Sequence, residues 1–307
     1  MLNKLSGNSI AVINFVFWGL LPLYYQFVVV NDIFEILAVR IIASIPTLAL
    51  FFWLMRKPWP SLQFFLAHKK DIFICAIATS LITISWCTFT YGLTHNKVLQ
   101  CSLGFFIAPL FAMAFGIILH KEQTDWLKKV AILLAFFGVG YQIYIYQKIP
   151  LLSLVMAISF ALYALCKKHC QFDLFLSVTV ENLILAPFAI LYLGYLLAHH
   201  QGLFLFSDAS TFWLYLGSAP MTIVPYLLYT LAINRTSLTM IGLLHYIEPS
   251  IQFILALWVF HEPFDKVKFI SFSFIWAGLL LVTIPKIIKL IKIRLAENNK
   301  KDSTTST

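Results

Sequence analysis

The sequence carries little charge for its length. Only 11% of its 307 residues are Asp, Glu, Lys or Arg, whereas a soluble domain carries roughly a quarter. Hydrophobic residues make up 61%, in long apolar runs that short polar clusters interrupt. Such runs exclude a β-barrel, in whose strands polar and apolar residues alternate. The composition therefore predicts an all-α polytopic membrane protein.

Signatures of enzymes and of metal or nucleotide sites are also missing. The sequence has no HExxH, no GxxxxGK[ST], no GxSxG and no dinucleotide-binding glycine pattern. Its five cysteines form no CxxC pair and are expected to be small buried residues. The net charge of +9 arises mostly from Lys and Arg between apolar runs or in the tail, which marks a cytoplasmic membrane face rather than a nucleic-acid surface. We therefore predict no catalytic activity, no cofactor, no metal and no nucleic-acid partner.

Ten apolar segments approach or exceed the roughly 20 residues that a helix needs to cross a bilayer. The predicted spans are residues 8–30, 33–55, 71–93, 98–119, 126–146, 150–169, 174–197, 210–232, 237–260 and 267–290. With this layout, 17 of the 22 Lys and Arg residues fall on the side of the two termini and 4 on the other side, while Arg40 lies inside a span. Both termini are therefore expected to be cytoplasmic.

The chain contains an internal repeat. Residues 105–138 resemble residues 245–278, and Pro109 and Pro249 lie 140 positions apart. Because each copy would contain five spans, the second copy is predicted to be inverted in the membrane. The predicted domains are a first repeat (8–146), a second repeat (150–290) and a basic, polar cytoplasmic tail (291–307). Inverted repeats are typical of carriers, with the substrate site near the midplane between the copies.

Charged residues inside spans are the first candidates for function, because a charge in a bilayer costs several kcal/mol unless it is paired or solvated. Arg40 and Glu181 occupy equivalent positions in the two copies, at levels that allow a direct or water-bridged ion pair. A structural ion pair and a role in substrate binding or gating both remain open.

Glu248 is a further candidate, near the middle of the predicted span 237–260 and directly before Pro249. The proline is expected to free the carbonyl of His245, so a carboxylate, an imidazole and a carbonyl would lie together. Gln252 shares a helix face with Glu248. Glu248 is expected to bind a cationic group or to carry a proton, unless it is a buried carboxylate satisfied by its neighbours.

Aromatic residues within the spans complete the candidate set. They are Trp18, Tyr25, Trp86, Tyr91, Tyr163 and Tyr246. Packing is the commoner role of such residues, but Trp18 and Tyr163 occupy the same position in the two copies. Glu122 and Glu262 also match across the repeat, at helix ends, where they are expected to fix a turn.

Together these residues resemble the RarD-type branch of the drug/metabolite transporter superfamily, which carries EamA repeats. The segments that carry the resemblance are FWGLLPLYY at 17–25, EILAVR at 35–40, GFFIAPL at 104–110, SFALYAL at 159–165, and LLHYIEPSIQF through FHEPF at 243–264. The resemblance implies a ten-helix carrier of the bacterial inner membrane that works by alternating access through a central cavity. Members of the family usually have Asn where this chain has Ala108, and neutral residues at His245 and Glu248.

The leading interpretation is a secondary active transporter, or permease, for a small organic solute such as an amino acid, an amine-bearing metabolite or a drug. Its partners would be that solute, the lipid bilayer, and a coupling proton or an exchanged solute. An integral-membrane enzyme would need a catalytic cluster at one interface. A non-transporting membrane assembly protein would normally have a sizeable soluble domain.

Overall fold

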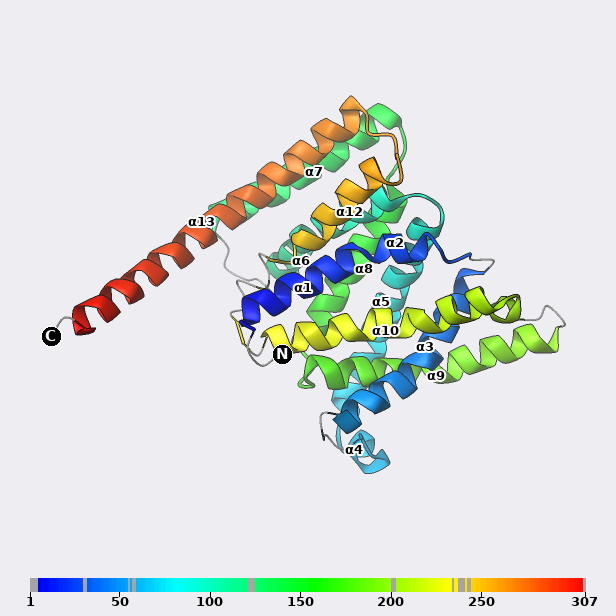
Figure 1. The fold of residues 1–307 in the computed structure, drawn as a ribbon. Coiled ribbons are helices and arrows are strands. Elements are labelled where there is room, and N and C mark those ends of the chain that lie inside the picture. Colours follow the sequence, from blue (N-terminus) through cyan, green and yellow to red (C-terminus); the bar gives the residue numbers. More distant parts are fainter. Residues whose placement is uncertain are drawn as a thin grey trace. The chain divides into compact units, whose positions relative to one another are not determined.

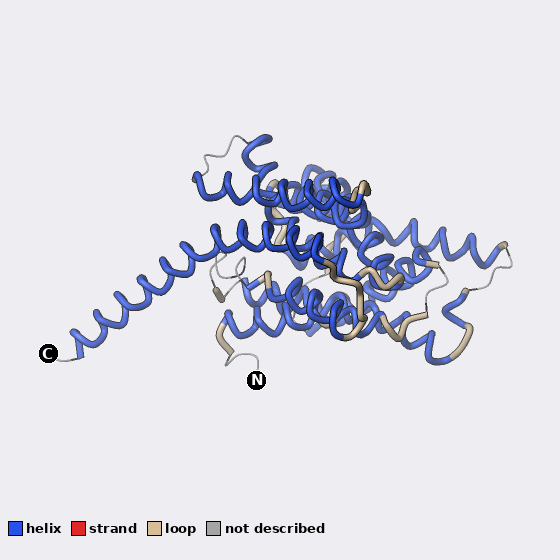
Figure 2. Tube along the Cα trace, turned by 90° about the horizontal axis from the view of Figure 1, so that it is seen from above, coloured by secondary structure: helices blue, strands red, loops and turns tan. Residues whose placement is uncertain are grey.

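The structure is a computed structural model that describes most of the chain. The residues outside the description are 1–4, 30–31, 55, 57–58, 121–124, 200–202, 234, 237–240, 242–243 and 306–307, together with the side chains of 62, 66, 116, 119–120, 168, 174, 230, 233, 286 and 289–305. Within the described part the chain is helical and contains no strand (Figure 2). This agrees with the predicted all-α class.

Figure 1 labels the described helices in chain order. They are α1 (Gly7–Gly19), α2 (Leu21–Tyr25), α3 (Ile33–Leu54), α4 (Leu62–Ala67), α5 (Lys69–Thr94), α6 (Val98–His120), α7 (Trp126–Tyr146), α8 (Leu151–Lys168), α9 (Leu174–Ala198), the 3₁₀ turn η2 (Phe204–Phe206), α10 (Ala209–Ile233), α12 (Ile247–Trp258) and α13 (Lys266–Thr305).

Among the described residues, seven helices are long and apolar enough to cross a membrane, and two shorter apolar helices, Leu151–Lys167 and Ile247–Trp258, accompany them. Large apolar side chains on these helices are exposed, among them Trp53 at 73% and Leu191 at 71%. Because exposed apolar area is costly in water and not in lipid, these side chains fit a bilayer. The predicted polytopic membrane fold is confirmed.

Two of the predicted spans are not continuous helices. The first is divided at Leu20, between α1 and α2, where Pro22 occupies the first turn of the second piece. In the ninth, residues 245–246 form a turn and α12 begins only at Ile247. A proline lacks the N–H that a helix interior requires but is tolerated in a first turn. Pro22 of α2 and Pro249 of α12 therefore each lie in the first turn of a new helix.

The described chain divides into two compact units, one comprising Met1–Phe115 and Leu151–Pro263, the other Gly116–Pro150 and Phe264–Thr307. In the first unit α5 packs against α8, α1 against α10, and α3 against α9. Each of these pairs joins a helix of one repeat to a helix of the other. Exchanging the two repeats exchanges α1 with α8 and α5 with α10, so the set of pairs maps onto itself. The first unit is thus held together by contacts between the repeats.

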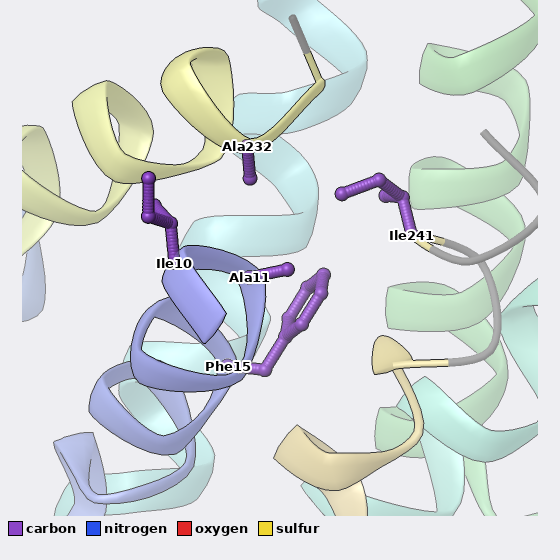
Figure 3. Close-up of a cluster of buried hydrophobic side chains, with 5 residues drawn as sticks. All are labelled: Ile10, Ala11, Phe15, Ala232 and Ile241. Atoms are coloured by element: carbon purple, nitrogen blue, oxygen red, sulfur yellow. The ribbon is translucent and has the colours of Figure 1, made fainter. Parts of the chain in front are cut away.

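An apolar cluster within this unit fixes the position of α1 (Figure 3). Its members are Ile10, Ala11 and Phe15 of α1, Ala232 of α10, and Ile241. The Phe15 ring also stacks on the ring of His245, with centroids 5.0 Å apart. The cluster therefore holds α1 against both α10 and the turn that precedes α12.

Glu262 closes the start of α6. Its carboxylate accepts the backbone N–H groups of Val98 and Leu99, the latter at 3.0 Å, and the first N–H groups of a helix have no partner within it. A carboxylate at this position also opposes the positive end of the helix dipole. Glu262 therefore has a structural role, as predicted, although the segment it fixes is the start of another helix. Its repeat equivalent, Glu122, lies outside the described residues.

The second unit is built on the pairing of α7 with α13, which lie side by side in Figure 1. Glycines make this close approach feasible. A Cβ atom at Gly138 of α7 would lie 2.7 Å from the carbonyl oxygen of Ser271, and one at Gly278 of α13 would lie 2.9 Å from that of Ala131. Small residues that let helix backbones approach are the usual means of packing in membranes. Gly138 of α7 therefore faces α13, and its repeat equivalent, Gly278 of α13, faces α7.

Replacing Gly138 with valine is expected to lower the stability of the protein, because the new side chain would collide with the α13 backbone. Overpacking of this kind costs about 1–3 kcal/mol. The measurement is the melting temperature of the purified protein in detergent. Gly140→Val is the matched control, since nothing lies within 4 Å of a Cβ atom at that position of the same helix. Equal melting temperatures for the two variants would contradict the glycine contact.

Candidate functional site

The first unit contains a cavity of about 350 Å³. Nine of its sixteen lining residues are Phe, Trp or Tyr. They are contributed by α1, α5, α6, α8 and α10, and the turn and first residues of α12 complete the wall. Helices of both repeats therefore surround one aromatic cavity, which is large enough for a small organic molecule.

Three lining residues of this aromatic cavity carry or can carry charge, namely Lys167, His245 and Glu248. Glu248 is 6% exposed. Its carboxylate lies 3.6 Å from Nε2 of His245 and 3.4 Å from Nε2 of Gln252. Both contacts are long for hydrogen bonds. The carboxylate therefore retains acceptor capacity toward a molecule in the cavity.

The interruption before α12 places Glu248 in the first turn of that helix, and not in the middle of a continuous one. The structure also corrects the expectation for His245. Its carbonyl is not free, because the backbone N–H of Glu248 approaches it at 3.3 Å. In a continuous helix the carbonyl of His245 would lack a donor, because Pro249 has no N–H. The chain instead turns at residues 245–246, and the backbone N–H of Glu248 approaches this carbonyl.

A second, smaller cavity of about 60 Å³ adjoins the aromatic one. Ile82, Trp86 and Tyr226 line both. The smaller cavity is more polar, since Arg40 and Glu181 are among its lining residues. We refer to it as the polar cavity. The two candidate charges of α3 and α9 therefore face one space, with Trp86 and Tyr226 between that space and the aromatic cavity.

Glu181 pairs with Lys167 and not with Arg40. Nζ of Lys167 lies 2.6 Å from Oε1 of Glu181, and the hydroxyls of Tyr163 and Ser177 approach the same carboxylate at about 3.4 Å. Lys167 follows Tyr163 by one helical turn on α8, so both side chains point toward α9. Glu181 is thus a buried carboxylate with one strong cationic partner.

Arg40 has a different environment. Its guanidinium carbon lies 4.4 Å from the centroid of the Trp86 ring, a cation–π contact. Among the described residues, its Nη1 is buried and has no hydrogen-bond partner. A buried charged donor without an acceptor is costly. Arg40, which lines the polar cavity, therefore has an unsatisfied cationic donor.

Seven of the eleven predicted site residues line one or both cavities. They are Trp18, Arg40, Trp86, Tyr163, Glu181, His245 and Glu248. Gln252 is fully buried, and its side-chain amide nitrogen approaches the carboxylate of Glu248.

The other three predicted aromatic residues line neither cavity. Tyr25 is buried against Tyr24. Tyr91 is 37% exposed and stacks on His95, and Tyr246 precedes the first residue of α12.

Sequence reasoning missed Lys167. It lies at the end of an apolar run, where a lysine is typical of the cytoplasmic interface. A signal was nevertheless present, because Lys167 follows the candidate Tyr163 at helical spacing.

An all-helical polytopic fold with two repeats around an aromatic cavity is the architecture of a membrane carrier. The model of the EamA-like transporter family matches residues 5–142 and 147–284. The chain belongs to this family, and the predicted RarD-type resemblance is confirmed by the relatives described next.

The chain is 34% identical to the "Uncharacterized transporter YojE" of Bacillus subtilis, over 92% of this chain and 94% of the relative. It is 30% identical to "Protein RarD" of Streptomyces exfoliatus, over 87% and 84%, and 29% identical to "Protein RarD" of Escherichia coli, over 90% and 93%. A solved crystal structure shares the fold with a TM-score of 0.57 over 91% of this chain and 98% of its own, at 12% identity. These comparisons support a membrane transporter.

Proposed function

We propose that the protein is a secondary active transporter of the bacterial inner membrane, with both termini cytoplasmic. It carries a small organic solute with a positively charged amino group, such as an amino acid, an amine-bearing metabolite or a drug. The solute occupies the aromatic cavity, and the two repeats expose this cavity alternately to the two sides of the membrane. Because the sequence has no nucleotide-binding motif, the driving force is an ion gradient, such as protons, or the exchange of a second solute.

The observation that carries this proposal is Glu248 in its aromatic surroundings. Its carboxylate lies in the wall of a cavity lined mainly by rings, and its neighbours His245 and Gln252 make only long contacts with it. An ammonium group is attracted both by a carboxylate and by the faces of aromatic rings. The aromatic cavity is thus suited to a cationic group carried on an apolar body.

The proposal is tested by a thermal-stability screen of the purified protein against amines, amino acids, nucleosides and antibiotics. We expect amine-bearing compounds to raise the melting temperature, since a ligand that binds only the folded state stabilises it. Glu248→Gln should remove the shift. Glu35→Gln is the control, because Glu35 is also buried but accepts the backbone N–H of Leu205 and lines neither cavity. Amine-induced shifts that survive in Glu248→Gln would contradict the role of this carboxylate.

A further inference from the structure

We propose that Lys167 receives an anionic group of the solute, so that the carrier takes zwitterions, with the ammonium group at Glu248 and the carboxylate at Lys167. The inference rests on the proposed function and extends it from one charged group of the solute to two. Without solute, the carboxylate of Glu181 pairs with the ammonium group of Lys167. When the solute binds, the carboxylate of Glu181 pairs with Arg40 instead.

Lys167 stands between the two cavities. It lines the aromatic cavity, while its partner Glu181 lines only the polar one. Its ammonium group has three N–H donors, and the bond to Glu181 is the one side-chain hydrogen bond it makes within the described residues. Lys167 therefore offers donors to a molecule in the aromatic cavity, at a position where it already binds a carboxylate.

Arg40 provides the second partner that the exchange needs. It lines the same polar cavity as Glu181, and no acceptor in the described part of the chain reaches its buried Nη1. A carboxylate that left Lys167 would find there a cation whose donor is unsatisfied. Glu181 can thus release Lys167 to a solute without becoming an unpaired buried charge, the state that makes breaking a buried pair so costly.

Charge balance favours a solute with both signs. Apart from His245, the acidic and basic side chains that line the two cavities are Arg40, Lys167, Glu181 and Glu248, whose formal charges sum to zero. A zwitterion keeps that sum and gives Glu248 and Arg40 partners at once, the latter through Glu181. An amine alone or an acid alone would leave one net charge in a region of low dielectric, which is unfavourable.

The test uses matched sets of ligands on the full-length purified protein, with affinities measured by isothermal titration calorimetry. One set is phenylalanine, phenethylamine and hydrocinnamate, and the other is leucine, isoamylamine and isocaproate. Each set keeps the body and removes one charged group at a time. We expect at least one zwitterion to bind about tenfold or more tightly than its amine and its acid. An affinity ratio of this size corresponds to one hydrogen bond to a charged group.

Variants assign this advantage to Lys167. The double variant Lys167→Met/Glu181→Gln removes both charges of the pair and should abolish the advantage of the zwitterion while amine binding persists. Glu181→Gln alone removes the competing carboxylate and should tighten zwitterion binding. Lys97→Met is the matched control, because Lys97 also lies over a tyrosine ring, that of Tyr91, but lines neither cavity.

Three other results of these measurements would contradict either the zwitterion inference or the proposed function. If amines bind as tightly as zwitterions in the wild type and the double variant, the inference fails and the proposed function stands. If an equimolar mixture of amine and acid binds as well as the zwitterion, one solute with two groups is excluded. If no amine and no zwitterion binds, the proposed function fails as well.

Discussion

Glu181→Leu is expected to lower the free energy of unfolding by about 3–5 kcal/mol, the usual cost of removing one partner from a buried ion pair. Glu181 is 5% exposed, and its loss leaves Lys167 without the carboxylate at 2.6 Å. Arg40 would lose its nearby carboxylate in the polar cavity at the same time. The measurement is chemical or thermal unfolding of the purified protein in detergent.

Two further variants separate this effect from a mere change of shape. Lys167→Met/Glu181→Leu removes both members of the pair, so we expect it to regain much of the loss, because apolar replacement of a whole pair is often neutral. Asp125→Leu breaks the pair between Asp125 and Lys128, which are 4.0 Å apart, with Asp125 83% exposed. Such surface pairs contribute about 0–1 kcal/mol. A loss in Glu181→Leu no larger than in Asp125→Leu would contradict the buried pair.

Filling the aromatic cavity is expected to abolish solute binding while the protein stays folded. Ala164 of α8 lines this cavity and is exposed, so an indole placed there by Ala164→Trp has room to enter the space that the solute would occupy. We expect the affinity for any ligand found in the thermal screen to fall at least about a hundredfold, since a filled pocket forfeits nearly all its contacts with the ligand. Isothermal titration calorimetry measures this directly.

The control is Gly194→Trp on α9, where nothing lies within 4 Å of a Cβ atom, so that the indole enters open space. Both variants add the same aromatic area, and their melting temperatures should remain close to that of the wild type. Unchanged affinity in Ala164→Trp would show that the ligand binds elsewhere.

Each charged residue that the sequence proposed as a site candidate lies in the wall of a cavity. Arg40, Glu181 and Glu248 lie inside apolar runs, where an ionisable side chain is too costly to occur without a partner or a function, and all three line a cavity. Lys167 escaped notice because lysines near span ends commonly extend toward the interface. Which cation pairs with Glu181 depends on side-chain reach across helices, and no periodicity in the sequence reports that.

The sequence did not distinguish the aromatic residues that line a cavity from those that do not. Trp86 and Tyr91 both belong to α5, yet Trp86 lines both cavities while Tyr91 stacks on His95. Five residues correspond to about 140° around a helix, so the two rings point in different directions. Composition alone cannot tell a ring that lines a cavity from one that packs at a surface. The turn before α12 likewise lies beside a tertiary contact, the stacking of Phe15 on His245, which no local sequence pattern reports.

Solute exchange in proteoliposomes tests most directly whether the protein carries a solute through the aromatic cavity. Liposomes that contain the protein and are loaded with an unlabelled ligand from the screen are placed in a dilute solution of the same ligand in labelled form. We expect label to accumulate with the wild type and with Glu35→Gln, and not with Glu248→Gln or Ala164→Trp. Accumulation at wild-type rates in those two variants, or none with the wild type, would contradict a carrier that works through this cavity.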